Sequence, residues 1–148
     1  MNKAFKLPVE LKDPSLLEGR ALIGGEWRWA ASGRTFEVRN PARGEVVAEV
    51  ADCGVEETRA AIDAAHAAWK GWAAMLAAER SALVRRLRDL MMAHQDDLGA
   101  ILCAEMGKPL AEAKGEIAYG ASFLEWFAEE GRRVYGDVIP THAEGKRL

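Results

Sequence analysis

The chain has 148 residues, of which 49% are hydrophobic and 29% are charged, and its formal net charge is −3. This length is enough for one domain with a hydrophobic core, and the composition is typical of a soluble globular protein. The near-neutral charge argues against binding to nucleic acid or to an anionic membrane. No stretch approaches the roughly 18 apolar residues of a membrane span. The two cysteines form no disulfide framework, so we expect a cytoplasmic protein.

The N-terminal third predicts an arm followed by a small β unit. Residues 1–20 are polar and read as an arm with one short turn near Ser15. Gly24 and Gly25 separate two β-type runs and can both take a positive φ, which is a strong hairpin signal. A second pair of strands is joined by a turn that ends at Gly44. The expected strands are residues 21–23 with 26–29, and residues 35–38 with 45–50.

Helical periodicity begins at Val55 and predicts three helices. The first carries many alanines and one apolar face. The second is long, and Gly107 is suited to end it. The third is expected from Pro109 to about Val134, where Gly136 can end it. The visible chain is therefore expected to be mainly α. The apolar stripe expected on the second helix contains Leu83, Leu87, Leu90, Met91, His94, Leu98, Ile101 and Leu102.

The third helix is apolar on two opposite sides. At about 100° per residue, one stripe contains alanines with Ile117 and Leu124, whereas the opposite side gathers aromatic residues. A helix with two apolar sides is normally enclosed within a larger protein. We therefore expect one side of this helix to lack a partner within these 148 residues. The residues on that side are Tyr119, Ser122, Phe123 and Trp126.

The sequence contains no catalytic motif, and we assign it no catalytic and no cofactor-binding residue. Neither a dinucleotide-binding glycine motif nor a phosphate-binding loop occurs. Cys103 is a candidate nucleophile with His94 as its base. Nine residues separate them, which places them on opposite faces if the helix is continuous. Cys103 is therefore interpreted as an inert thiol, and His94 as a core histidine.

Other polar and aromatic features are given ordinary structural interpretations. The adjacent pairs Asp96-Asp97 and Glu129-Glu130 read as solvated charge, because neighbouring helical residues point in different directions. The five tryptophans are interpreted as core anchors of the hairpin and helices. One basic cluster, interpreted as a solvated helix face, contains Arg80, Arg85, Arg86 and Arg88.

Several short motifs occur in one order along the chain. They are LIGGEW (22–27), NPARGE (40–45), ETRAAIDAA (57–65), Glu79-Arg80 and EMGKP (105–109). Together they resemble the N-terminus of the NAD(P)-dependent aldehyde dehydrogenase superfamily, which has an α/β fold. Residues 90–98 and 115–140 look specifically like the succinate-semialdehyde dehydrogenases.

The resemblance implies an oxidoreductase that converts succinate semialdehyde to succinate with NADP or NAD. In the family, a cysteine thiolate attacks the aldehyde, hydride passes to the nicotinamide, and a glutamate activates the hydrolytic water. All of these groups would lie downstream of Leu148. Residues 21–148 would then be an incomplete N-terminal portion of the cofactor-binding domain, unable to bind the dinucleotide or to act alone. The complete enzyme is expected to form a homo-oligomer, either a dimer or a tetramer.

Two pairs of residues correspond to functional positions in the family. Tyr119 corresponds to a position in the wall of the substrate tunnel, and Phe123 follows one turn later. Val38, through its carbonyl, and Glu105 correspond to a site for an alkali cation. Two alternatives are kept: Tyr119 and Phe123 are simply packing residues, and Glu105 is a surface carboxylate near a helix end.

Two alternatives to this function are kept. The first is a free-standing helical interaction module derived from such an enzyme, with the second apolar face as its binding surface. The second is a related aldehyde dehydrogenase, for example one for glutarate semialdehyde, whose substrate-binding residues would also lie downstream.

Overall fold

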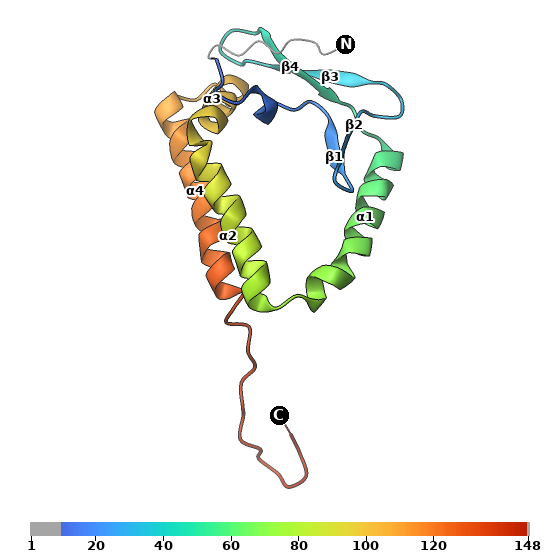
Figure 1. Ribbon diagram of the computed structural model, residues 1–148, viewed down its shortest axis with the longest axis vertical. Coiled ribbons are helices and arrows are strands. Elements are labelled where there is room, and N and C mark those ends of the chain that lie inside the picture. Colours follow the sequence, from blue (N-terminus) through green and yellow to red (C-terminus); the bar gives the residue numbers. More distant parts are fainter. Residues whose placement is uncertain (1–9, 148) are drawn as a thin grey trace.

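The computed structural model describes residues 10–147, so the first nine residues of the expected arm lie outside the described part. Four helices and two small antiparallel sheets form an open frame, in which β3 and β4 lie across one end and α1 runs apart from the α2–α4 pair (Figure 1). The prediction of a mainly α chain with a small antiparallel β unit is confirmed. The elements are a 3-10 turn at Pro14–Leu16, strands β1 Ala21–Ile23, β2 Glu26–Arg28, β3 Thr35–Arg39 and β4 Val46–Ala51, and helices α1 Val55–Ala74, α2 Ala77–Ala93, α3 Gln95–Met106 and α4 Leu110–Glu130.

Both predicted strand pairs are present, each as its own two-stranded sheet. In the first, Leu22 is opposite Trp27, and the intervening Gly24 and Gly25 have φ values of 61° and 85°. These values lie in the region that glycine adopts without steric cost, which is why this turn closes in two residues. In the second sheet, β3 pairs with β4 with one register shift next to Val38.

The long second helix of the sequence analysis is two helices, so the count of three was wrong. His94 has φ −104° and ψ 18°, which is not helical, and it ends α2 and precedes α3. The hydrophobic stripe did not reveal this break, because a change at one residue leaves apolar side chains at similar spacing on both sides. His94 is the N-cap of α3, and that helix is unbroken from Gln95 through Cys103, so the predicted separation of His94 from Cys103 along one helix holds.

Helix α4 ends at Glu130 rather than near Val134. Gly131 is its C-cap, and a tight turn follows in which the Arg132 and Arg133 amides bond back to the preceding carbonyls. Val134 is 89% exposed, so the residues beyond this turn have no surface against which a further helical turn could pack. They continue as a tail that leads away from the helices (Figure 1).

The described core is built from small side chains. Val47 is the largest side chain that is fully buried. Helices α3 and α4 approach closely at Gly99, where an added Cβ would lie 2.8 Å from Lys114 Cγ. The buried apolar residues are Leu11, Ile23, Ala30, Val47, Ala48, Ala100, Ala104, Ala113, Ala121 and Ala128.

Asp97 holds the arm against α3, so the interpretation of this residue as solvated charge was wrong. It is buried, and its two carboxylate oxygens accept hydrogen bonds from the backbone N–H groups of Lys12 and Asp13 at 3.0 and 2.9 Å. The neighbouring Asp96 is exposed and forms ion pairs with Lys12 and Lys114. The start of α3 therefore connects the arm, α3 and α4.

The interpretation of the tryptophans as core anchors was wrong for this chain. No residue of α1 is buried, and Trp69 is 64% exposed. The leucine stripe of α2 is also uncovered, with Leu83, Leu87 and Leu90 each about half exposed. Periodicity identified these apolar faces correctly, but their partners are not among the described residues. All five tryptophans, Trp27, Trp29, Trp69, Trp72 and Trp126, are exposed.

Candidate functional site

The outward face of α4 carries the candidate site. Ala113, Ala121 and Ala128 point into the α2 and α3 contacts and are buried. Residues half a turn away must then point outward, and Tyr119 and Phe123 are 65% and 46% exposed. The prediction that one apolar side of this helix lacks a partner is confirmed within the described residues.

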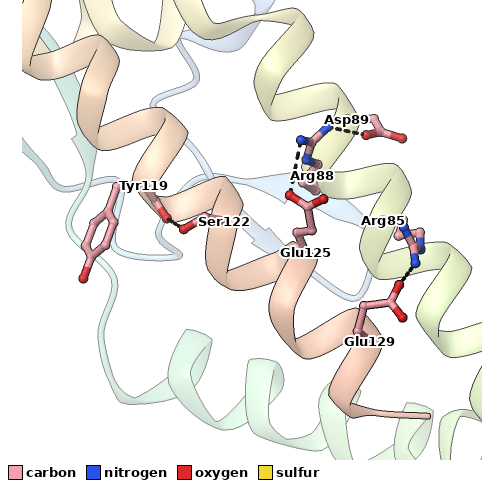
Figure 2. A network of polar contacts seen from close by, with 7 residues as sticks. All are labelled: Arg85, Arg88, Asp89, Tyr119, Ser122, Glu125 and Glu129. Carbon is pink, nitrogen blue, oxygen red and sulfur yellow. Dashed lines mark hydrogen bonds and ion pairs between the residues drawn. The ribbon is translucent and has the colours of Figure 1, made fainter.

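Tyr119 and Phe123 form one aromatic unit. Their ring centroids are 4.9 Å apart with an interplanar angle of 79°, an edge-to-face arrangement that the ring quadrupoles favour. The Ser122 hydroxyl donates a hydrogen bond to the Tyr119 carbonyl at 2.7 Å. Figure 2 shows Tyr119 projecting away from α2. The two rings therefore present a preformed aromatic surface on the open side of the helix.

The aromatic surface continues toward the end of α4. A shallow depression of about 370 Å³ is lined by Ser122, Phe123, Trp126 and Phe127. Phe127 was missed in the sequence analysis, although it is 63% exposed. Its position at the edge of both stripes on a helical wheel was the available signal.

The opposite flank of α4 is joined to α2 by ion pairs. Arg85 pairs with Glu129, and Arg88 Nη2 lies 3.3 Å from Glu125 Oε2 (Figure 2). Arg88 also pairs with Asp89 at 3.0 Å. The pKa of Arg88 is raised by its hydrogen bond to Asp89 and by the charge of Glu125. The interpretation of the arginine cluster as a solvated face was therefore incomplete, since two of its members join helices.

Val38 and Glu105 belong to segments that meet at one corner. Val38 pairs with Ala48 in the second sheet, and Glu105 lies in the last turn of α3. Pro41, in the turn after β3, packs so closely on Gly107 that an added Cβ would lie 2.7 Å from Pro41 Cγ. Burial raises the pKa of the Glu105 carboxyl. No salt bridge of Glu105 occurs among residues 10–147.

Nothing in the described chain assembles a reaction centre. Cys53 is exposed, Cys103 is half-buried, and both are free thiols. Over residues 10–147 no hydrogen bond joins Cys103 to His94, and no group of three metal-binding side chains is found. The described part also holds no helix long and apolar enough to cross a bilayer.

The described residues do not fit a dinucleotide. Dinucleotide-binding folds use the carboxyl ends of parallel strands and a glycine-rich turn at a helix N-terminus. The two sheets described here are two-stranded and antiparallel. Residues 10–147 therefore contain no parallel sheet of the kind on which a dinucleotide binds.

Comparison with known proteins gives the fold and the family. The described fold superimposes with a TM-score of 0.90 on the crystal structure of succinate-semialdehyde dehydrogenase from Burkholderia pseudomallei, with 58% identity over 94% of this chain and 29% of that one. The sequence profile of the aldehyde dehydrogenase family matches residues 27–148. The chain belongs to the aldehyde dehydrogenase family.

Two curated relatives have nearly the same similarity. The chain is 54% identical to the NADP(+) succinate-semialdehyde dehydrogenase GabD of Escherichia coli and 55% identical to the glutarate-semialdehyde dehydrogenase of Pseudomonas putida. Each match covers 95% of this chain and 29% of the relative. The chain therefore spans less than a third of the length of these relatives.

Proposed function

We propose that this chain is the N-terminal portion of an oxidoreductase that oxidises an ω-carboxy aldehyde, with succinate semialdehyde as substrate, using NADP or NAD. The similarity over 95% of the chain to enzymes of this kind carries the proposal. Residues 21–148 form part of its cofactor-binding domain. The catalytic cysteine, the hydrolytic base and the dinucleotide site lie in the portion that the relatives have beyond this segment.

Glutarate semialdehyde is the second candidate substrate, because the similarity to its dehydrogenase is equally high. The two aldehydes differ by one methylene and share a distal carboxylate. The α4 outward face offers aromatic surface to an aliphatic chain, but the Tyr119–Phe123 unit has no cationic group of its own. The carboxylate of either aldehyde would be bound by downstream residues.

Tyr119 and Phe123 form a wall of the tunnel through which the aldehyde enters. Their exposure and their fixed edge-to-face contact support this role, because a preformed aromatic surface costs little entropy on binding.

The Val38 carbonyl and Glu105 bind an alkali cation at the corner beside Gly107. One observation supports that site: the close contact between Pro41 and Gly107, which brings the turn after β3 to the end of α3.

The complete enzyme is a cytoplasmic homo-oligomer, a dimer or a tetramer. Two free cysteines fit a reducing compartment. The uncovered apolar faces of α1, α2 and α4 contact the rest of the same subunit and its neighbours.

The test uses the chain alone and the chain fused to the downstream portion of the E. coli relative. The chain alone is expected to give no reduction of NADP or NAD with succinate semialdehyde. The fusion is expected to reduce the cofactor. Turnover by the chain alone would refute the proposal that the active site lies outside this chain. An inactive but folded fusion would refute the assignment as part of such an enzyme.

Tyr119→Ala in the active fusion tests the tunnel. We expect a higher KM for the aldehyde and an unchanged KM for the cofactor, because only the aldehyde passes this wall. Tyr135→Ala is the matched control, since Tyr135 is 78% exposed in the tail. An unchanged KM for the aldehyde would indicate that Tyr119 has only a packing role.

A free-standing interaction module is the remaining alternative. The uncovered apolar face of α4 is the observation that favours it. A monodisperse chain that binds a hydrophobic dye but does not support activity in the fusion would favour this module.

A further inference from the structure

The centre of the α2–α4 contact is made of small groups. Ala121 and Ala128 are each 1% exposed, and a Cβ placed on Gly120 would lie 3.7 Å from Met91 Cε. Small side chains let two helices approach closely, but they interdigitate less than large ones. The fully buried side chains of α4 are all alanines.

Charged residues join α4 to α2 on one flank. Glu125 and Glu129 are four residues apart, so both lie on the same side of the buried alanines. They pair with Arg88 and Arg85 of α2, respectively. These side chains are between about a third and a half exposed, and ion pairs of this kind add little to the stability of a fold.

The flank is rigidly connected to the aromatic surface by the helix itself. At 100° per residue, Glu125 and Glu129 lie about 120° and 80° around the axis from Tyr119. Figure 2 shows the two glutamates directed to α2 and Tyr119 directed away from it. A rotation that separates the ion pairs must therefore turn Tyr119 and Phe123 by the same angle.

We propose that Arg85 and Arg88 are positioning residues that fix the rotation of α4 and thereby the direction of the Tyr119–Phe123 unit. The consequence for aldehyde entry rests on the proposed function. The orientation of the helix does not, because it is a property of the chain alone.

The first test measures the orientation in the whole 148-residue chain. With methyl-labelled methionine, the nuclear Overhauser effect between the Met91 methyl and the Gly120 α protons reports the α2–α4 contact. In Arg85→Ala/Arg88→Ala we expect it to weaken about twofold or more, the factor that loss of exposed ion pairs gives in an equilibrium constant, with helical circular dichroism unchanged.

Two further variants separate positioning from a general loss of charge. Exchange of the partners, Arg88→Glu with Glu125→Arg, should restore the effect. Arg86→Ala is the matched control, since Arg86 forms no ion pair within residues 10–147. An unchanged signal in the double variant, or an equal loss in Arg86→Ala, would overturn the proposal.

The second test measures the consequence in the fusion described above. Arg85→Ala/Arg88→Ala should raise the KM for succinate semialdehyde about twofold to fivefold and leave kcat unchanged, with rescue by the exchanged pair. An inactive fusion carrying the unaltered segment would contradict the proposed function, while the magnetic resonance experiment would still decide the positioning. A lost Overhauser effect with an unchanged KM would overturn the link to the reaction.

Discussion

Two regions of the molecule differ in what covers their apolar side chains. At the closed corner, formed by α3, the start of α4 and the turn at Pro41, Ala104 and Ala113 are buried. At the open end, formed by α1 and the leucine stripe of α2, large side chains such as Trp69 and Leu87 stay exposed. The described residues thus bury mostly small side chains and leave many of the large apolar ones uncovered, although Leu11 and Ile23 are buried.

This difference separates the contacts made inside the segment from those made outside it. Large apolar side chains gain most from burial, so an exposed set of them on helical faces indicates surfaces for other parts of a protein. The open end carries little of the segment's own packing. The following predictions test whether the two regions are in fact distinct.

The largest expected effect is the binding of a hydrophobic dye by the open end. The isolated chain should enhance the fluorescence of an anilinonaphthalene sulfonate dye, because α1 and the outward face of α4 are uncovered. The active fusion should not, because its downstream portion covers these faces. If the isolated chain does not enhance the fluorescence of the dye, the open end does not differ from the closed corner in its uncovered apolar surface.

The closed corner should be sensitive to a single methyl group. Gly107 has φ +76°, and an added Cβ would meet the Pro41 ring, so Gly107→Ala should lower the free energy of unfolding by about 2–4 kcal/mol. Gly136→Ala is the matched control, because nothing lies within 4 Å of its added Cβ and its φ is not positive. Chemical denaturation measures both, and equal effects would contradict the close corner contact.

Truncating a buried and an exposed side chain should change the free energy of unfolding in the opposite order to the number of atoms removed. Val47→Ala should cost about 1–3 kcal/mol, because Val47 is 1% exposed. Leu87→Ala removes more atoms but should cost less than about 0.5 kcal/mol in the isolated chain, because Leu87 is 52% exposed. In the fusion, Leu87→Ala should lower the free energy of unfolding more than Val47→Ala does. A large effect of Leu87→Ala in the isolated chain would show that the leucine stripe of α2 is already covered there.

The smallest expected effect is a pH dependence at the arm. Hydrogen bonds from Lys114 and Lys12 lower the pKa of Asp96 from 3.8 to about 2. Because the folded pKa is lowered, its stabilising contribution is present above about pH 4 and is lost as the pH falls toward 2. The amide signals of Lys12 and Asp13, followed by magnetic resonance, should shift in this range. Asp96→Asn should remove that component of the titration, and an identical titration in this variant would contradict the role of Asp96.

Local sequence signals predicted the strands and the starts of α1 and α4. Gly24 and Gly25 predicted the first hairpin, because glycine readily takes the positive φ values that two-residue hairpin turns require. Helical periodicity was expected from Val55, where α1 begins, and Glu57 completes its cap by accepting a hydrogen bond from the Gly54 amide at 2.7 Å. Each of these features depends on residues within a few positions of one another.

Long-range features were not predictable from the same signals. Asp97 looked like solvated charge because its partners, the amides of Lys12 and Asp13, are 85 and 84 residues away, respectively. Arg85 and Arg88 find their partners on a helix that follows much later in the chain. The break at His94 lies inside an uninterrupted apolar stripe. The break becomes visible in the tertiary structure, where α3 packs against α4 as a separate helix.

The sequence by itself determined the order of the elements, the apolar faces of the helices and the aldehyde dehydrogenase family of the chain. Short-range turn chemistry and helical periodicity are sufficient for the first two, and a series of motifs in one order for the third. The tertiary structure decided which apolar faces are covered and which charged groups join separate segments. Burial and ion pairing depend on neighbours in space, and periodicity describes only one element at a time. The surface around Tyr119 shows this division: its apolar character is encoded locally, whereas its direction depends on how α4 packs against α2.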